Sequence, residues 1–329
     1  MAKLQPELKS AACIRRSAAN PILTDRDVPY SSNLVFNAGV VRYENAYRMV
    51  FRNDYGYANG RFAGTNLGVA ESADGVRWTV RREPMIRAED VADGETLRIY
   101  DPRLTAIDGV IYICFAMDTR HGIRGGIGKI VGDFEGIDIL SLSTPDNRNM
   151  VLFPEKIDGM YVRLERPFPV YSRGRDRFDI WISRSPDLKF WGESELVLGV
   201  EDVPFANDKI GPAAPPIRTD AGWLTLFHAV DRDDARGKNG WENRWQKRYC
   251  AGVMLLDLQN PAKVVGLSTE PLIAPEMAYE TDMGFRTNVI FPGGLIAEDG
   301  RVKIYYGASD TVECLAESSV DELIALCKA

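Results

Sequence analysis

Five stretches of the chain repeat one pattern, in which a polar turn precedes a run of alternating apolar residues. They occupy residues 43–54, 107–118, 157–167, 220–231 and 298–310. Four of the runs end on an aspartate, at Asp54, Asp118, Asp231 and Asp310. A turn followed by such alternation is typical of the second arm of a β-hairpin. Successive units start about 50 to 80 residues apart, which suits one blade of a β-propeller with long loops.

A second element recurs between these units and has the form of an outer strand. It occupies residues 71–86, 183–198 and 260–275, and each copy ends in a short apolar run. The segment 19–24 has the form of a detached last strand. A strand supplied from the N-terminal side can complete the final blade, and this would close a ring of blades.

The repeat therefore predicts an all-β fold, a single five-bladed β-propeller domain over residues 1–329. A sandwich of two sheets is the alternative, and five repeated units fit a propeller better. Helical periodicity is confined to the two ends of the chain. It predicts an N-terminal helical extension within 1–18 and a C-terminal helix within 317–329.

The composition excludes several classes of function. Hydrophobic residues make up 45% and charged residues 26%, as in soluble globular proteins. No apolar run approaches the ~18 residues that span a bilayer, and the N-terminal stretch lacks a signal-peptide core, so we expect a cytoplasmic protein without a membrane partner. A net charge of −7 opposes nucleic-acid binding. With two histidines and no metal-ligand motif, we also expect no metal site.

One carboxylate stands out because no turn explains it. Asp108-Gly109 is an ordinary turn pair, but Asp101 precedes Pro102 between Tyr100 and Arg103. In a propeller, the inner strands line a central funnel, where such a side chain would lie. The repeated aspartates have a simpler alternative, because each can cap a turn.

Several cations stand in unusual surroundings. Arg166 lies in an apolar, proline-flanked segment, where an unpaired guanidinium is costly. Lys209 lies beside Gly211-Pro212. Each alone is explained by a salt bridge, for example to Glu165 or Asp208. Together they suit an oxyanion such as phosphate, because arginine binds phosphate oxygens bidentately. The candidate cluster is Arg148, Arg166, Lys209 and His228.

Long segments of the chain, from about residue 19 to 316, resemble the β-mannoside phosphorylases of glycoside hydrolase family 130. They include "NPILTDRDVPY", "RIYDPRLT", "PDNRNMVLFPEK", "RLERPFPVY", "ANDKIGPAAPPI" and "FPGGLIAEDGRVKIYYGASDT". The resemblance implies a five-bladed propeller and inverting phosphorolysis of a terminal β-mannosyl unit, giving α-D-mannose 1-phosphate. It implies inorganic phosphate as co-substrate and no cofactor.

The resemblance also assigns roles to residues. Its catalytic-acid motif matches Asp101, and its phosphate site matches the four candidate cations. It implies sugar contacts from Asn37, Arg52, Asp54, Tyr100, Asp282 and Asp310. A phosphorylase needs only an acid, because phosphate is already a nucleophile, whereas an inverting hydrolase also needs a base that activates water.

Three questions stay open at this stage. A β-mannoside hydrolase and a propeller that only binds carbohydrate are the alternative functions. The acceptor stays open: the motifs are closer to the mannooligosaccharide and mannosyl-N-acetylglucosamine enzymes than to those for mannosyl-glucose. Trp241 and Trp245, in the loop 231–245, are candidate stacking platforms beside the loop 55–66. A homo-oligomer is expected because the C-terminal helix carries an apolar stripe, unless that stripe packs on its own propeller.

Overall fold

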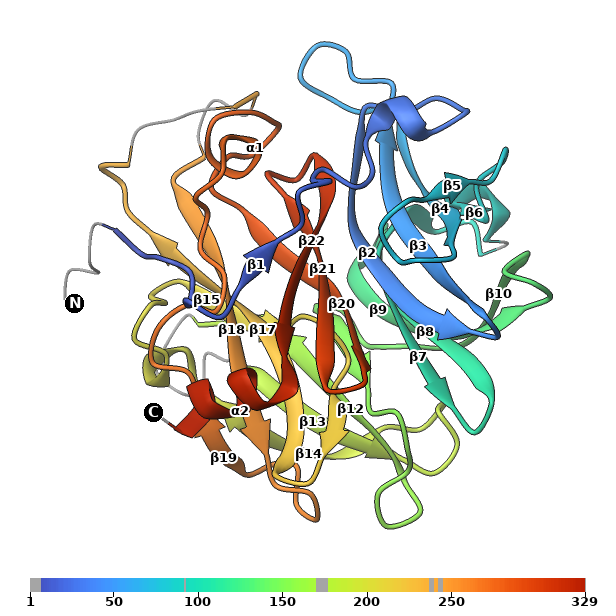
Figure 1. The fold of residues 1–329 in the computed structure, drawn as a ribbon. Helices are drawn as coiled ribbons and strands as arrows, with labels where there is room; N and C mark the ends of the chain where they lie inside the picture. Colours follow the sequence, from blue (N-terminus) through green and yellow to red (C-terminus); the bar gives the residue numbers. More distant parts are fainter. Residues whose placement is uncertain (1–6, 92, 170–176, 237–239, 242–244, 329) are drawn as a thin grey trace.

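The computed structural model describes residues 7–328 except 92, 170–176, 237–239 and 242–244. The described chain forms five antiparallel sheets arranged in a ring, with their strands running roughly along the ring axis (Figure 1). In each sheet the strands pair in chain order, except that the N-terminal strand is the last strand of the fifth sheet and that one short strand in each of two sheets pairs outside this order. The predicted five-bladed propeller is therefore confirmed.

The blades follow the chain in order. Blade 1 contains β2 (Leu34–Tyr43), β3 (Ala46–Tyr55), β4 (Gly64–Ser72), β5 (Thr79–Val80) and β6 (Ile86–Arg87). Blade 2 contains β7 (Thr96–Ile107), β8 (Val110–Thr119), β9 (Gly122–Val131) and β10 (Gly136–Leu142). Blade 3 contains β11 (Asn147–Leu152), β12 (Tyr161–Pro167), β13 (Ile180–Ser185) and β14 (Gly192–Leu198). Blade 4 contains β15 (Lys209–Pro212), β16 (Ile217–Thr219), β17 (Gly222–Arg232), β18 (Lys247–Leu256) and β19 (Val264–Leu267). Blade 5 contains β20 (Ile290–Glu298), β21 (Arg301–Ala308), β22 (Val312–Ser319) and β1 (Arg15–Arg16).

The repeated runs of the sequence are the second strands of the five blades, namely β3, β8, β12, β17 and β21. In three blades, a phenylalanine of the second strand lies opposite a glycine of the third: Phe51 with Gly68, Phe115 with Gly126, and Phe227 with Gly252. A Cβ atom on any of these glycines would lie 2.2 Å from the ring. The glycines therefore make room for the aromatic side chains between the sheets.

The ring is closed by the N-terminal segment. β1 pairs with β22 through Arg15 with Glu317 and Arg16 with Ala316, and Leu23 forms a further bridge with Glu313. The closing strand thus lies earlier than the predicted 19–24. The predicted N-terminal helix is wrong for residues 7–18, which are extended or in turns, while residues 1–6 lie outside the described part. A helix there would leave the edge of β22 and the buried carboxylate of Glu280 without their partners.

The C-terminal helix is present as α2 (Val320–Lys328), and residues 317–319 belong to β22. Its apolar stripe does not face solvent, because Leu323 and Cys327 are buried against blades 4 and 5. The stripe therefore supplies no reason for an oligomer, and the homo-oligomer stays a prediction. The other α-helix among the described residues, α1 (Ala278–Thr281), precedes blade 5, and no described helix is long and apolar enough to cross a membrane.

Candidate active site

The innermost strands of four blades are bulged where they reach the axis. Their register shifts after Phe36 in β2, Tyr100 in β7, Arg148 in β11 and Pro292 in β20. At three of these bulges the chain adopts a positive φ, at Asn37 (54°), Asp101 (54°) and Asn149 (58°). Asparagine and aspartate tolerate this left-handed conformation better than other residues with a side chain. The bulges turn all three side chains toward one cavity, which explains the position of Asp101.

This cavity has a volume of about 70 Å³ and is lined from all five blades and the segment before β20. Its walls are Asn37, Arg52, Asp101, Arg148, Asn149, Arg166, His228, Tyr249, Arg286, Phe291 and Asp310. Seven of the predicted site residues are therefore brought together from distant parts of the chain. In the described part of the chain, no group of three or more His, Cys, Asp or Glu side chains is arranged to hold a metal ion.

Asp101 is held by blade 1. Its Oδ1 accepts hydrogen bonds from Nδ2 of Asn37 at 2.9 Å and from Nη1 of Arg52 at 3.3 Å. Burial alone would raise the pKa of Asp101. The charges of Arg52 and Arg103 and the bond from Asn37 outweigh burial and lower this pKa, so the carboxyl group is ionised in the free enzyme.

Two predicted sugar contacts support the cavity from behind. Asp54 is buried and accepts two hydrogen bonds from Arg52, at 2.9 and 2.7 Å, and one from Thr65. Tyr100 donates its hydroxyl to Asp118 at 2.6 Å. Neither residue lines the cavity. Asp54 fixes the orientation of the Arg52 guanidinium, and the bond to Asp118 fixes the ring of Tyr100. Neither Asp54 nor Tyr100 faces the cavity itself.

The other repeated aspartates differ in role. Asp118 and Asp231 form ion pairs at the ends of their strands, with Arg98 at 3.5 Å and with Arg248 at 2.9 Å respectively. Asp310 alone of the four lines the cavity, 3.3 Å from Nη1 of Arg286. Burial and the nearby charge of Asp101 raise the pKa of Asp310, while Arg286 opposes the shift.

Of the predicted anion-binding cluster, Arg148, Arg166 and His228 form one wall of the cavity, which Lys209 does not line. Arg148 and Arg166 are paired across β11 and β12, and Nη1 of Arg166 lies 3.1 Å from Nε2 of His228. Gly211, opposite His228 in the sheet, leaves space for both side chains, because its Cβ would lie 2.5 Å from the imidazole. Lys209 begins the same strand, with its Nζ 5.3 Å from the ring of Tyr249.

This wall has an excess of positive charge. Burial and the charge of Arg148 lower the pKa of Arg166, and burial and Arg166 lower that of Lys209 well below its usual range. The Nε and Nη2 atoms of Arg166 and the Nε atom of Arg148 are buried without hydrogen-bond partners among the described residues. Buried donors of this kind are costly unless an acceptor reaches them, and an anion in the cavity could supply such an acceptor.

His228 is neutral in this setting. Burial and the charges of Arg166 and Lys209 lower the pKa of His228 well below its usual range. Because a guanidinium can only donate, Nε2 of His228 accepts from Arg166, and the proton of the ring lies on Nδ1. The ring is packed against Phe291, with 4.7 Å between centroids.

Four residues of the cavity were not predicted from the sequence. Asn149 occupies a bulge like that of Asp101, and an Asn or Asp inside an apolar inner strand was the signal for it. Tyr249, Arg286 and Phe291 carry no comparable signal. Asp282, by contrast, is exposed at the end of α1 and does not line the cavity, so the structure does not bring this predicted residue to the site.

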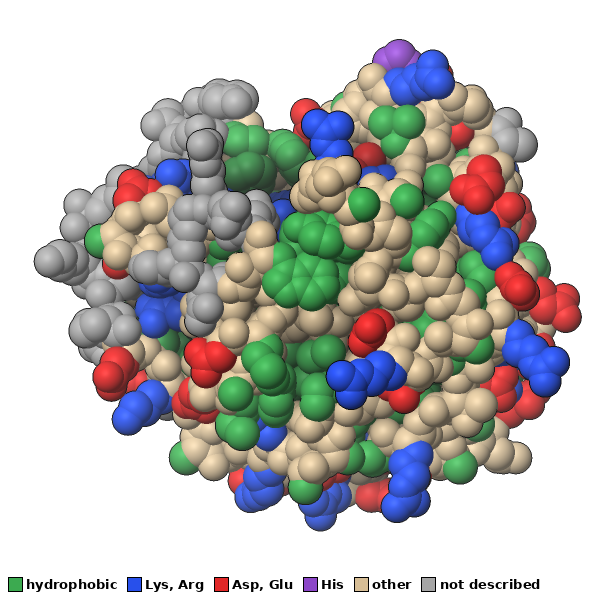
Figure 2. All heavy atoms as spheres, turned by 90° about the horizontal axis from the view of Figure 1, so that it is seen from above, with side chains coloured by type: hydrophobic (Ala, Val, Ile, Leu, Met, Phe, Trp, Pro, Cys, Tyr) green, Lys and Arg blue, Asp and Glu red, His purple; other side chains and the backbone are tan. Residues whose placement is uncertain are grey.

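The mouth of the funnel is aromatic. Tyr57 and Phe62, in the loop after β3, have their ring centroids 4.8 Å apart. The ring of Trp241 lies 5.2 Å from that of Tyr57, and Phe285 lies 5.3 Å from Phe62. These four residues are called the aromatic rim below. In the view from above, hydrophobic side chains gather near the centre of this end, and acidic and basic side chains are mixed around them (Figure 2).

The two predicted stacking platforms differ in position. Trp241 belongs to the rim and is 43% exposed. Trp245 packs inward, stacked on Tyr249 at 5.6 Å and donating its Nε1 to the carbonyl of Thr287. Trp245 therefore supports the wall of the site.

A larger hollow, of about 700 Å³, lies over blade 3 and is lined by residues such as Arg163, Glu165 and Trp191. Its most buried charges neutralise each other, because Arg163 and Glu165 form an ion pair at 2.8 Å. The axial cavity is ten times smaller, but it alone combines an ionised carboxylate with unpaired buried cations.

Fold and site together define a class of protein. It is a five-bladed propeller that holds an ionised carboxylate, Asp101, against a cluster of cations, an arrangement that suits an enzyme acting with an oxyanion. A family model described as β-1,4-mannooligosaccharide phosphorylase, that of glycoside hydrolase family 130, matches residues 20–329. The chain belongs to this family, and it is an enzyme of the mannoside phosphorylase class.

Individual relatives cover almost the whole chain. A β-1,4-mannooligosaccharide phosphorylase of Ruminococcus albus is 33% identical over 336 residues, spanning 98% of this chain and 93% of the relative. A 1,2-β-oligomannan phosphorylase of Thermoanaerobacter sp. is 30% identical over 308 residues, spanning 91% and 95%. The solved β-1,2-mannobiose phosphorylase of Listeria innocua has the same fold, with a TM-score of 0.81 at 24% identity over 96% of this chain and 99% of that chain.

The lowered pKa of His228 predicts a pH dependence of stability. Below pH ~6.5 the unfolded chain binds a proton at this position that the folded protein excludes. The free energy of unfolding therefore decreases as the pH is lowered, by up to ~1.4 kcal/mol per pH unit. The variant His228→Asn should lose this component of the slope between pH 7.5 and 5.5 in phosphate-free buffer, as followed by urea unfolding. His121→Asn, at an exposed position, is the control and should keep the wild-type slope. Equal slopes for wild type and His228→Asn would contradict the assignment.

Proposed function

We propose that this enzyme catalyses inverting phosphorolysis of terminal β-1,4-mannosyl linkages in mannooligosaccharides or mannosyl-N-acetylglucosamine. The products are α-D-mannose 1-phosphate and the shortened acceptor. The observation that carries the proposal is the juxtaposition of Asp101 with the unpaired donors of Arg148 and Arg166 around one cavity. Attack by phosphate on the anomeric carbon breaks the bond to the acceptor oxygen, which then takes a proton.

The cation wall favours phosphate over water as the nucleophile. A hydrolase needs a carboxylate base for water, and Asp310 is the second carboxylate at the cavity. It is, however, paired with Arg286, whose guanidinium occupies one of its carboxylate oxygens. Buried guanidinium donors, by contrast, neutralise and orient phosphate, which needs no base.

The proton balance depends on the bound anion. In the free enzyme Asp101 is ionised because cations surround it. Phosphate on Arg148 and Arg166 cancels part of this positive potential, which raises the pKa of Asp101 and favours its protonated, acidic form. The family resemblance implies that the proton then reaches the glycosidic oxygen through the 3-hydroxyl of the mannosyl ring.

Linkage and acceptor are the finer part of the proposal. The description of the family model and the 33% identical relative support a β-1,4 linkage, while the 30% identical relative is named for β-1,2-linked oligomannan. The aromatic rim supports an acceptor sugar that stacks beyond the cleaved bond, because aromatic side chains bind the apolar faces of sugar rings.

The direct test is turnover of four disaccharides with and without phosphate: β-1,4-mannobiose, β-1,2-mannobiose, mannosyl-N-acetylglucosamine and mannosyl-glucose. We expect turnover of β-1,4-mannobiose or mannosyl-N-acetylglucosamine only when phosphate is present, with α-D-mannose 1-phosphate as the product by NMR. Release of free mannose without phosphate would establish a hydrolase instead. No turnover of any β-mannoside would favour a carbohydrate-binding propeller, and preferred cleavage of β-1,2-mannobiose would overturn the linkage alone.

The role of Asp101 makes a separate prediction. In the variant Asp101→Asn, the amide oxygen can still accept the hydrogen bonds from Asn37 and Arg52 of blade 1. The amide has no acidic proton, however. The rate of phosphorolysis should fall by ~10²- to 10⁴-fold, the usual contribution of general acid catalysis, while mannoside binding by calorimetry persists. Asp108→Asn, in an exposed turn, should have wild-type activity. A folded Asp101→Asn variant with a wild-type rate would remove Asp101 from catalysis.

The anion site is tested at Arg166. Replacing it with alanine removes a buried charge-assisted donor, worth about 1.5 to 3 kcal/mol. The apparent affinity for phosphate should fall by roughly 10- to 150-fold, with a much smaller effect on the mannoside, when each substrate is titrated separately. The exposed Arg218 gives the matched control, and Arg218→Ala should leave both affinities within about twofold. An unchanged phosphate affinity in Arg166→Ala would show that Arg166 does not bind the anion.

A further inference from the structure

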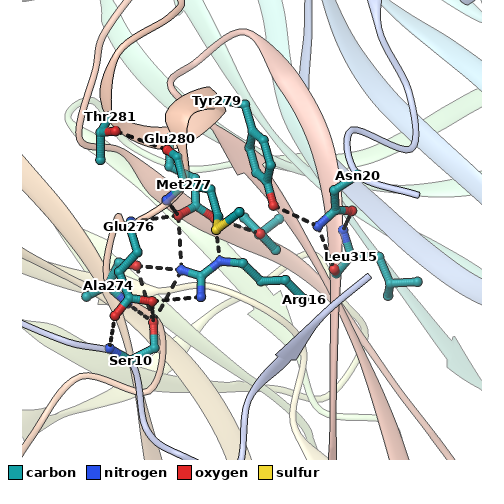
Figure 3. A network of polar contacts seen from close by, with 11 residues as sticks. Ser10, Arg16, Asn20, Ala274, Glu276, Met277, Tyr279, Glu280, Thr281 and Leu315 are labelled. Carbon is teal, nitrogen blue, oxygen red and sulfur yellow. Dashed lines mark hydrogen bonds and ion pairs between the residues drawn. The ribbon is translucent and has the colours of Figure 1, made fainter. Parts of the chain in front are cut away.

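The closing strand is joined to the mouth of the funnel by a buried ion pair. Arg16, in β1, binds Glu280 through Nε at 2.8 Å and Nη2 at 3.0 Å (Figure 3). The same guanidinium donates to Glu276 at 2.9 Å and to the carbonyl of Ala274 at 2.7 Å. Ser10 adds a hydrogen bond of 2.9 Å to Glu276, so the N-terminal segment is fastened here at two points.

Glu280 is the centre of this network and is fully buried. Besides Arg16, its carboxylate accepts the hydroxyl of Tyr306 at 2.8 Å and the backbone N–H groups of Glu276 and Met277 at 2.8 and 2.9 Å. The last two bonds fix the first turn of α1. A helix of this length has little stability of its own, so its place in the fold depends on these contacts.

Glu280 also holds one end of the segment that forms the mouth. The chain leaves α1, runs through residues 282–287 and returns where the N–H of Asn288 donates to the carbonyl of Glu280 at 2.7 Å. This mouth segment (282–287) carries Arg286, which lines the cavity, and Phe285 of the aromatic rim. Its backbone is also held by hydrogen bonds to residues 309 and 311, by Trp241 at Gly284 and Phe285, and by Nε1 of Trp245 at the carbonyl of Thr287.

The cation wall has no such dependence. Arg148, Arg166 and His228 stand on β11, β12 and β17, in blades 3 and 4, and each is held within its own sheet. Loss of Arg16 is therefore expected to displace the mouth segment, on the sugar side of the site, more than the cation wall.

We propose that Arg16 is a positioning residue for the mannoside, acting through Glu280 on the mouth segment. The inference rests on the proposed phosphorolysis for its kinetic consequence. Without Arg16, Glu280 is a buried carboxylate lacking its cation, a state that is strongly unfavourable and that α1 relieves by moving. Arg286 and Phe285 then lose their fixed places at the cavity and the rim.

The experiment compares Arg16→Gln with Arg15→Gln in the full chain. Arg15 is the neighbouring residue of β1, and its side chain is 62% exposed, so it is the matched control. In Arg16→Gln, hydrogen–deuterium exchange of the backbone amides of residues 284–288 should accelerate, whereas amides in β12 and β17 keep their protection. The KM for the mannoside should rise roughly fivefold or more, the lower end of typical coupling between separate sites. The KM for phosphate should stay within about twofold.

Two outcomes would overturn the proposal. One is a loss of thermal stability with unchanged exchange at 284–288 and unchanged KM values, which would make the pair purely structural. The other is an equal rise of both KM values, which would indicate general loosening. If Arg16→Gln does not fold, Tyr306→Phe decides, because it removes one bond to Glu280 and should give smaller changes in the same direction; no change would refute the role. The exchange readout does not need turnover, so a failure of phosphorolysis is seen separately in the wild type.

Discussion

The crowding of positive charge at the axis is the constraint that the rest of the structure has to meet. Arg148, Arg166 and Lys209 repel one another in a buried place where no described carboxylate pairs with Arg166. Only rigid supports can hold such a group ready for an anion, because flexible ones would let the charges separate into water. The propeller provides these supports, since Arg148 and Lys209 stand on the first strands of blades 3 and 4 and Arg166 stands on the second strand of blade 3. The packing of the blades thus offsets the unfavourable free energy of holding these like charges together.

The two carboxylates of the cavity show how the same constraint divides roles. Asp101 is surrounded by cations and has a lowered pKa, whereas Asp310 is buried beside the negative charge of Asp101 and has a raised one. Environment alone separates two chemically identical groups in this way. In the proposed function, phosphate at Arg148 and Arg166 would change the potential at both carboxylates and would thereby couple proton transfer to the binding of phosphate.

The sequence predicted what depends on local pattern. Alternation and turns located all five second strands, and the anomalous surroundings of Asp101 and Arg166 marked two residues that line the cavity. It could not predict Tyr249, Arg286 or Phe291, because nothing near them in the chain distinguishes them from ordinary wall residues. The N-terminal helix was wrong for a related reason. Periodicity near residue 16 is a local signal, but the partner that keeps this segment extended, Glu280, lies far along the chain.

Closure of the ring by β1 has a consequence for biosynthesis. Arg16 leaves the ribosome roughly 300 residues before its partner Ala316 in β22. At about 5 to 20 residues per second, the first strand waits roughly 15 to 60 s for its place in blade 5. Blades 1 to 4 can form during that wait, since each pairs only within itself. The axial cavity needs every blade and is therefore completed only after blade 5 has been made. Until then the exposed edge of the growing propeller can pair with strands of other chains.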